Sequence, residues 1–233
     1  MRWPFKKHDS KPKTAAVIVA AGSSNRMGFD KVFAELDGSP VLFHSIWAFE
    51  NCDKVDEIII VLREEMMADS FNLSKTYGFN KIHSIVKGGN TRQQSVFLGV
   101  QACSEDVEYI CIHDGARPLV SQEVINSAID AAFIHSAATA AVPVKDTIKQ
   151  SKDGFISATV PRDDLMIIQT PQVFKKEVYL AAYSDARCEY SDDCQLLEAI
   201  GAAVAFSDGD YKNIKLTTPD DLVFAEMLFA EKR

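Results

Sequence analysis

A chain of 233 residues, 47% of them hydrophobic, is long enough for one α/β domain with a sizeable core. Its formal net charge of −8 argues against general nucleic-acid binding, which requires a broad basic surface. No run approaches the roughly 20 apolar residues of a membrane helix, and the basic start MRWPFKKHDSKPK lacks the apolar centre of a signal peptide. We therefore expect a single cytoplasmic domain over residues 1–233, with residues 1–13 as a flexible tail and with no nucleic-acid or membrane partner.

The five cysteines form no CxxC pair and have no regular spacing. Zinc knuckles and disulfide frameworks both require such spacing. Buried free thiols are the simpler prediction.

Short apolar strands alternate with helices along the chain. The predicted strands are TAAVIVAAG from Thr14, EIIIVL (Glu57–Leu62), KIHSIV (Lys81–Val86), EYICIH (Glu108–His113) and TAAVPV (Thr139–Val144). One helix is predicted after Ser39 and Pro40, as N-cap and first helical residue, and another after the N-cap Ser121. This alternation predicts a mostly parallel sheet with ligands beyond the carboxyl ends of its strands.

The segment AAGSSNRMGFDK directly follows the first strand. Ala20, Ala21 and Gly22 allow backbone N–H groups to approach a ligand closely. Arg26 and Lys31 add two positive charges to the same turn, and a triphosphate requires both donors and cations. The spacing matches neither GxGxxG nor GxxxxGK[ST]. A nucleoside triphosphate site and a tight strand-to-helix turn with solvated cations both remain open for this segment alone.

A second glycine-containing loop, KGGNTRQQSV, follows the strand that ends at Val86. Gly89, Asn90 and Ser95 lie where a helix opens, and helix N-termini favour anions while Asn and Ser side chains can bond a base edge. An ordinary Gly-Gly turn capped by Thr91 is the stronger prediction for this segment taken alone.

The segment HDGARP ends the strand EYICIH. A carboxylate at the end of a buried strand needs a cation, a metal or several donors. Asp114 is therefore predicted either to pair with Arg117 or to bind metal or phosphate. His113, inside the hydrophobic strand, is predicted to be a core histidine with its hydrogen bonds satisfied.

The alternation of strands and helices changes over residues 145–170. The segments DTIKQ and FISATV flank an Asp-Gly pair, which predicts a β-hairpin about Asp153 and Gly154. So short an insertion has too little core of its own. It is predicted to project as an arm that packs on a partner subunit, with a loop folded over its own domain as the alternative.

The C-terminal part predicts a helix ending near Gly201, a strand around Ala203–Phe206 and a last helix capped by Thr218. Asp192 and Asp193 are interpreted as first-turn acids of a helix capped by Ser191, with no catalytic role. Arg162, at the base of the hairpin, and Lys215, on a predicted short strand, are each compatible with a surface cation.

Taken in order, these segments resemble the 2-C-methyl-D-erythritol 4-phosphate cytidylyltransferase family from about Ala15 to Leu228. The segments that carry the resemblance are AAGSSNRMG with Lys31, GGNTRQQSV, HDGARP, VPVKDTIK, TVPRDDL, QTPQVF, YSDD and NIKLTTPDDL. Eight motifs in one order are far more specific than any one of them.

The resemblance implies that the 4-phosphate of methylerythritol phosphate attacks the α-phosphorus of CTP, with Mg²⁺ assisting and pyrophosphate leaving. The catalytic residues it implies are Arg26, Lys31, Arg162 and Lys215. Those implied to bind CTP are Ala20, Ala21, Gly22, Gly89, Asn90 and Ser95. Those implied to bind the polyol phosphate are Asp114, Arg117, Thr147, Arg162, Thr170 and Lys215, with Asp114 also the implied metal ligand.

The resemblance also implies a Rossmann-like, mostly parallel mixed sheet flanked by helices, with the 145–170 hairpin as a dimerisation arm. In the family the arms of a homodimer cross, so Thr147 and Arg162 are expected to serve the neighbouring subunit's site. A ribitol 5-phosphate cytidylyltransferase is the nearest alternative, and the alanine before the arginine of HDGARP favours methylerythritol phosphate. A non-catalytic nucleotide-binding domain is the more remote one.

Overall fold

The protein is built around a seven-stranded sheet with the strand order β11-β7-β10-β6-β1-β4-β5. The computed structural model describes residues 11–22 and 32–231. The sheet strands are β1 (Thr14–Val19), β4 (Glu57–Leu62), β5 (Ile82–Lys87), β6 (Tyr109–Asp114), β7 (Ala137–Pro143), β10 (Met166–Lys175) and β11 (Ala205–Asp208). All run parallel except β10, which is antiparallel to both its neighbours. The predicted Rossmann-like, mostly parallel mixed sheet is confirmed.

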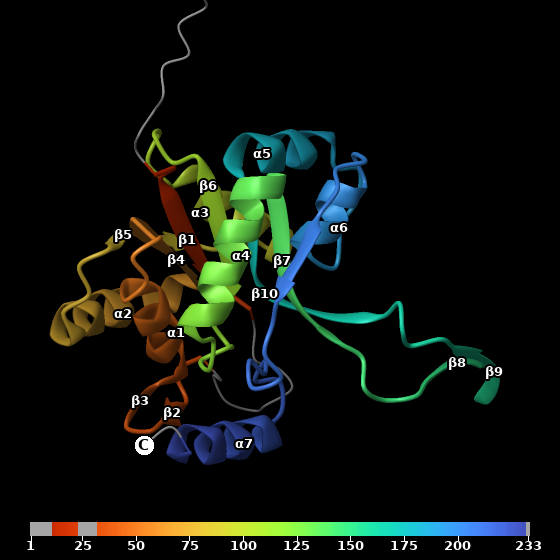
Figure 1. Cartoon of the computed structure of the whole chain (residues 1–233). Coiled ribbons are helices and arrows are strands. Elements are labelled where there is room, and N and C mark those ends of the chain that lie inside the picture. The colour runs from red at the N-terminus through yellow and green to blue at the C-terminus, as the bar shows by residue number, and fades with distance from the viewer. Residues whose placement is uncertain (1–10, 23–31, 232–233) are drawn as a thin grey trace, which may run out of the picture.

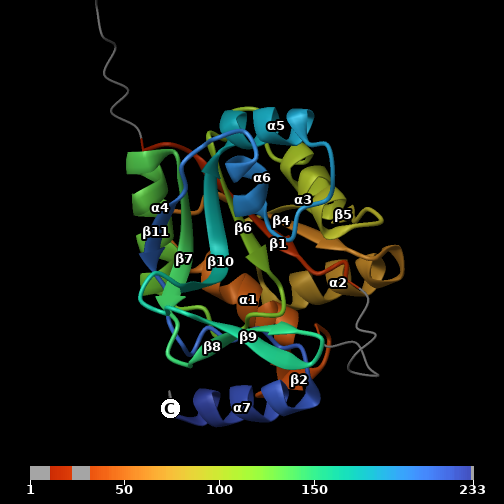
Figure 2. The ribbon, with the colours of Figure 1, turned by 90° about the vertical axis from the view of Figure 1, so that its right-hand side faces the viewer.

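Helices cover both faces of this sheet (Figures 1 and 2). They are α1 (Val41–Glu50), α2 (Glu64–Tyr77), α3 (Arg92–Gln101), α4 (Gln122–His135), α5 (Lys176–Asp185) and α6 (Asp193–Glu198). A further helix, α7 (Pro219–Ala230), lies beyond the end of the sheet (Figure 1), where it packs in a small separate core with Leu36 and Leu119. Among the described residues no helix is long and apolar enough to cross a membrane.

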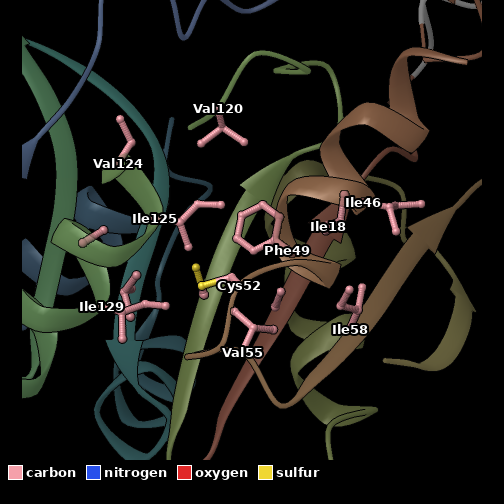
Figure 3. Close-up of a cluster of buried hydrophobic side chains, with 14 of the residues drawn as sticks. Ile18, Ile46, Phe49, Cys52, Val55, Ile58, Val120, Val124, Ile125 and Ile129 are labelled. Carbon is pink, nitrogen blue, oxygen red and sulfur yellow. The ribbon is translucent and has the colours of Figure 1, made fainter. Parts of the chain in front are cut away.

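Alternation along the central strands explains why the sheet is apolar on both faces. On β1, Ala16 and Ile18 join a core with α1 and α4, whereas Ala15 and Val17 join a second core with α3, α5 and α6. Figure 3 shows the first core, where Phe49 of α1 lies between Ile18 of β1 and Ile125 of α4. A strand buried on both sides is fixed in register, and this fixes where its carboxyl end and the following loop lie.

Two predicted helix starts have different outcomes. Ser121 caps α4 as expected, since its side chain accepts a hydrogen bond from the Val124 N–H. The expectation for Ser39 and Pro40 is wrong, because these residues form β3 (Ser39–Pro40), which pairs with β2 (Glu35–Leu36). Pro40 then serves as the N-cap of α1 without a side-chain bond. The intervening Asp37-Gly38 turn, with φ of 49° and 78°, supplies the chain reversal that makes this pairing possible.

The predicted hairpin is confirmed as a two-stranded sheet of β8 (Ile148–Lys152) and β9 (Phe155–Val160). Its Asp153-Gly154 turn has φ of 52° and 84°, the left-handed conformations that favour this residue pair. In Figure 1 the hairpin projects well away from the central sheet.

Three further expectations for the C-terminal half require correction. The last helix begins as expected, with a capping box at Thr218. However, α6 is capped by Asp192 rather than Ser191, because the Asp192 side chain accepts the Gln195 N–H. Lys215 lies on an irregular segment and not on a strand, and the neighbouring Leu216 N–H donates to the Ala116 carbonyl. The predicted strand around Ala203–Phe206 exists but begins two residues later, at Ala205.

The prediction of buried free thiols is confirmed for four of the five cysteines and is wrong for Cys188, which is exposed.

Candidate functional site

The loops that follow β1, β5 and β6 meet at one edge of the sheet and enclose a cavity of about 380 Å³. It is lined by Val19, Ala20, Ala21, Gly22, Val32, Arg63, Gly89, Asn90, Thr91, Arg92, Ser95, Asp114, Ala116 and Lys215. All six residues predicted to bind the nucleotide are among them. The structure therefore brings together two glycine-containing loops that are about 70 residues apart in the sequence, as parallel strands require.

Close backbone approach explains why glycine follows β5. A Cβ on Gly88 would lie 2.3 Å from the Ala21 Cβ and 2.9 Å from the Ser95 Oγ, so any side chain there would separate the two loops. Ser95 in turn accepts a hydrogen bond from the Gly89 N–H at 3.1 Å and donates one to the Thr91 carbonyl at 2.8 Å. Thr91 caps α3, as the simpler interpretation of this segment predicted. The same turn nevertheless forms a wall of the cavity.

A second, smaller cavity of about 160 Å³ lies on the other side of Asp114. It is lined by Arg92, Asp114, Arg117, Ile168, Gln169, Thr170, Gln172, Ser191, Asp192 and Lys215. Arg92, Asp114 and Lys215 line both cavities. These three side chains therefore form the boundary between two adjoining sites.

Asp114 is the negative centre of this boundary. Its Oδ2 lies 2.7 Å from the Lys215 Nζ and 3.8 Å from the Arg117 Nε, and its Oδ1 lies 3.5 Å from the Arg92 Nε. Burial by itself would raise the pKa of Asp114, but the charges of Arg92, Lys215 and Arg117 together hold that pKa well below its usual range. The predicted ion pair with Arg117 is present, but Arg117 is the most distant of the three cations and Lys215 is the closest.

A chain of hydrogen bonds fixes the backbone beneath Asp114. The His113 Nε2 lies 3.2 Å from the Arg117 carbonyl oxygen, which can only accept, so this nitrogen carries the proton. The His113 Nδ1 then accepts from the Thr170 hydroxyl, whose oxygen accepts the Asp114 N–H. His113 is fully buried, as predicted for a core histidine. Its function is to hold the Asp114–Arg117 turn in place against β10.

Sequence reasoning missed Arg92 as a site residue and Asp193 as its partner. The Arg92 guanidinium, at the start of α3, donates to the Asp193 carboxylate at 2.7 Å, and Asp193 is 1% exposed. The two residues are 101 positions apart, so no local pattern could pair them. The sequence did offer one indication that Arg92 belongs to the site, because this cation directly follows the glycine-containing segment GGNT.

Four predicted site residues are not placed in either cavity. Thr147 and Arg162 lie exposed at the base of the hairpin, where the Arg162 guanidinium donates to the Lys145 carbonyl. Arg26 and Lys31 lie outside the described residues.

Whether a metal ion can bind between the two cavities depends on one carboxylate, that of Asp114. The described residues contain no group of three His, Cys, Asp or Glu side chains with ligand geometry. Asp114, however, lines both cavities, and its Oδ1 has its cation no closer than 3.5 Å, so this oxygen can accept another ligand. One carboxylate supplemented by phosphate oxygens is the usual donor set for Mg²⁺ at nucleotide sites.

The chain is similar to proteins of one family over nearly its whole length. Residues 14–231 match the family model described as 2-C-methyl-D-erythritol 4-phosphate cytidylyltransferase. Relatives bearing that name occur in Caldanaerobacter subterraneus subsp. tengcongensis, 48% identical over 91% of this chain and 97% of the relative, and in Dehalococcoides mccartyi, 43% identical over 95% and 98%.

Solved structures of proteins with the same described activity superpose on this chain. The 4-diphosphocytidyl-2C-methyl-D-erythritol synthase of Anaerococcus prevotii superposes with a TM-score of 0.85 at 30% identity, covering 95% of this chain and all of that one. The 2-C-methyl-D-erythritol 4-phosphate cytidylyltransferase of Thermus thermophilus superposes with a TM-score of 0.77 at 30% identity, covering 92% and 98%.

Proposed function

The chain belongs to the 2-C-methyl-D-erythritol 4-phosphate cytidylyltransferase family, and we propose that its two adjoining cavities divide the two substrates of that reaction between them. The enzyme transfers CMP from CTP to 2-C-methyl-D-erythritol 4-phosphate in isoprenoid biosynthesis. The larger cavity, with its glycine-containing loops, holds CTP. The smaller one holds the polyol phosphate.

The shared boundary of Asp114, Lys215 and Arg92 is the observation that supports this division. The reaction requires the acceptor phosphate to lie against the α-phosphate of CTP, so two sites with a common wall suit it. An oxygen of the 4-phosphate forms a bond to the α-phosphorus, and the bond from that phosphorus to the bridging oxygen of the β-phosphate breaks. Pyrophosphate leaves with the bonding electrons.

Cations on either side of the boundary offset the negative charge that two phosphates bring together. Lys215 lies between the cavities, and Arg117 lines the smaller one. The Arg117 Nη1 donates to the Asn213 carbonyl at 2.7 Å, which holds this guanidinium at the wall of the smaller cavity. Arg26 and Lys31, which the sequence places after Gly22, would act on the triphosphate when the charge on its oxygens rises.

A bound Mg²⁺ would be held by Asp114 and by phosphate oxygens, and it would neutralise charge on those oxygens. Asp114 also orients the Lys215 ammonium at 2.7 Å. With its pKa held low, this carboxylate stays ionised and serves as an acceptor for substrate hydroxyls.

The hairpin over residues 145–170 acts as a dimerisation arm in this proposal. The exposed Thr147 and Arg162 at its base would complete the acceptor-phosphate site of the second subunit. A cytoplasmic homodimer is the assembly that these features support.

An assay with radiolabelled CTP tests the proposal. Label should move to 2-C-methyl-D-erythritol 4-phosphate with release of pyrophosphate, and ribitol 5-phosphate offered at the same concentration should be a poor acceptor. Adding a chelator should stop transfer, and adding Mg²⁺ should restore it. Transfer to ribitol phosphate at an equal or higher rate would contradict the assignment.

A further inference from the structure

Arg92 lies between two carboxylates at the boundary of the cavities. Its Nη1 lies 2.7 Å from the Asp193 Oδ2, while its Nε lies 3.5 Å from the Asp114 Oδ1. The guanidinium is thus bonded to Asp193 and only near Asp114. Planar guanidinium groups form close paired bonds with a carboxylate wherever geometry allows, so this unequal sharing requires a cause.

The position of Asp193 supplies that cause. Its carboxylate is 1% exposed, and its Oδ1 lies 3.5 Å from the Tyr179 hydroxyl. The backbone N–H of Asp193 donates to the Gln172 Oε1 at 3.2 Å, which ties the start of α6 to β10. The Asp193 carboxylate is therefore fixed in position. The Arg92 side chain has to adopt the conformation that brings its guanidinium to Asp193.

We propose that Asp193 is a positioning residue whose buried carboxylate draws the Arg92 guanidinium away from Asp114 and so leaves Asp114 available to Lys215 and to the bound polyol phosphate. The inference rests on the proposed division of substrates between the two cavities. Asp193 itself lines neither cavity and acts only through Arg92.

Electrostatic attraction determines where Arg92 moves when Asp193 loses its charge. Asp114 would then be the only carboxylate that Arg92 contacts among the described residues, and 3.5 Å is a short distance to close. A paired Arg92–Asp114 bond would occupy Asp114 Oδ1 and compete with Lys215 for the same carboxylate. Substrate would then have to break that bond in order to bind, so the cost appears in the binding step rather than in the chemical step.

The test compares Asp193→Asn with the matched control Asp220→Asn. Both changes remove one charge from a first-turn acid of a helix, at α6 and α7, and Asp220 is exposed and lines neither cavity. For Asp193→Asn we expect the KM for the polyol phosphate to rise about tenfold or more, with a smaller change in kcat. The control should stay within about twofold of the wild type in both constants.

A double-mutant comparison separates positioning from simple support of the fold. In an Arg92→Gln background, Asp193→Asn should have no further effect on this KM, because the group that it positions is gone. An equal effect in both backgrounds would overturn the proposal. So would a loss of kcat with KM unchanged, which is the result expected if Asp193→Asn only lowers the fraction of folded enzyme.

A crystal structure of Asp193→Asn provides a readout independent of turnover. The Arg92 guanidinium should move within hydrogen-bond distance of Asp114, and an unmoved Arg92 would overturn the proposal. If the wild type failed to turn over the two substrates, the proposed function would fail, and the Arg92 position would still decide this inference.

Discussion

At the scale of single residues, Asp114 is a buried carboxylate kept ionised by neighbouring charge and not by water. It is 8% exposed, and Lys215, Arg92 and Arg117 all approach it. The Asp114 carboxylate is the negative charge that these three cations share. Without it, the three positive charges would repel one another. The carboxylate therefore stabilises the local fold as well as the site.

Replacing Asp114 by Asn should reveal both contributions. The isosteric change leaves three cations without their shared counter-charge, so we expect the free energy of unfolding to fall by about 3 kcal/mol in urea titrations. We expect kcat/KM for transfer to fall by about 100-fold. Asp220→Asn is the control, and an Asp114→Asn enzyme of full activity would show that the carboxylate has no role in the site.

His113 gives a prediction about pH. Burial lowers its pKa to about 4, whereas a histidine in the unfolded chain titrates near 6.5. Between these values the unfolded chain binds a proton that the folded protein does not, so the free energy of unfolding falls as the pH falls from 6.5 to 4. The loss from this residue is on the order of 3 kcal/mol.

Urea unfolding at several pH values between 7 and 4 measures this slope. A His113→Gln variant should have a shallower slope than the wild type, although its stability at pH 7 will be lower because the contact between the imidazole and the Phe49 ring is lost. His44, whose pKa burial also lowers, contributes with the same sign and is present in both proteins. Identical slopes would show that the pKa of His113 is the same in the folded and the unfolded protein.

At the scale of elements, the placement of α3 against the sheet fixes the walls of both cavities. Gly99 lies where α3 approaches β1 and β4, and a Cβ there would lie 2.5 Å from the Val17 Cγ1 and 2.7 Å from the Val61 Cγ2. The same helix presents Arg92 and Ser95 at its first turns. A shift of the helix would therefore move the site.

Gly99→Ala should destabilise the fold by about 2 kcal/mol, because the added methyl group overpacks a buried contact. This outcome is opposite to the gain that alanine usually brings inside a helix. Gln101→Ala, on the exposed part of the same helix, is the control and should be neutral or slightly stabilising. Thermal unfolding of both variants distinguishes the two effects, and a more stable Gly99→Ala protein would contradict the close packing.

The elements differ in how far the sequence predicted them. Continuous apolar runs such as EIIIVL predicted the parallel strands because such strands are buried on both faces. β10 was not predicted, since Gln169, Thr170 and Gln172 interrupt any apolar pattern. All three side chains are nevertheless buried, because they bond to Asp210, His113 and Asp192 from other parts of the chain. A strand whose buried side chains are polar lacks the apolar pattern by which strands are predicted from sequence.

At the scale of the whole molecule, the hairpin arm presents apolar surface that its own subunit does not cover. Phe155 and Ile156 are 78% and 71% exposed on a two-stranded sheet, which is marginal on its own in water. Exposed apolar side chains gathered at such a tip are typical of a subunit contact.

Analytical ultracentrifugation of Phe155→Ser/Ile156→Ser tests this role of the arm. We expect the wild type to sediment as a dimer and the variant to dissociate at micromolar concentration. Ile134→Ser is the matched control, because Ile134 is 75% exposed but lies on α4, away from the arm. A variant that remains dimeric would assign the contact to another surface.

Mixed dimers test whether the arm acts on the neighbouring site. Arg162→Ala and Lys31→Ala proteins should each be nearly inactive, Arg162→Ala mainly through handling of the polyol phosphate. Unfolding and refolding the two together should restore up to about a quarter of wild-type activity, since a mixed dimer then retains one site with both residues. Failure to complement would indicate that Arg162 serves its own subunit.

The sequence by itself determined the parallel sheet, the two glycine-containing loops and the hairpin, because each depends on residue types close together in the chain. It also determined the family, through the order in which several such segments follow one another. Only the tertiary structure decided that Lys215, and not Arg117, is the close partner of Asp114, and that Arg92 is bonded to Asp193. These pairs join segments that are about 100 residues apart, and their geometry depends on how α3, α6 and the segment before α7 pack on one sheet. Local patterns predict which chemistry is present, whereas packing decides which charges meet.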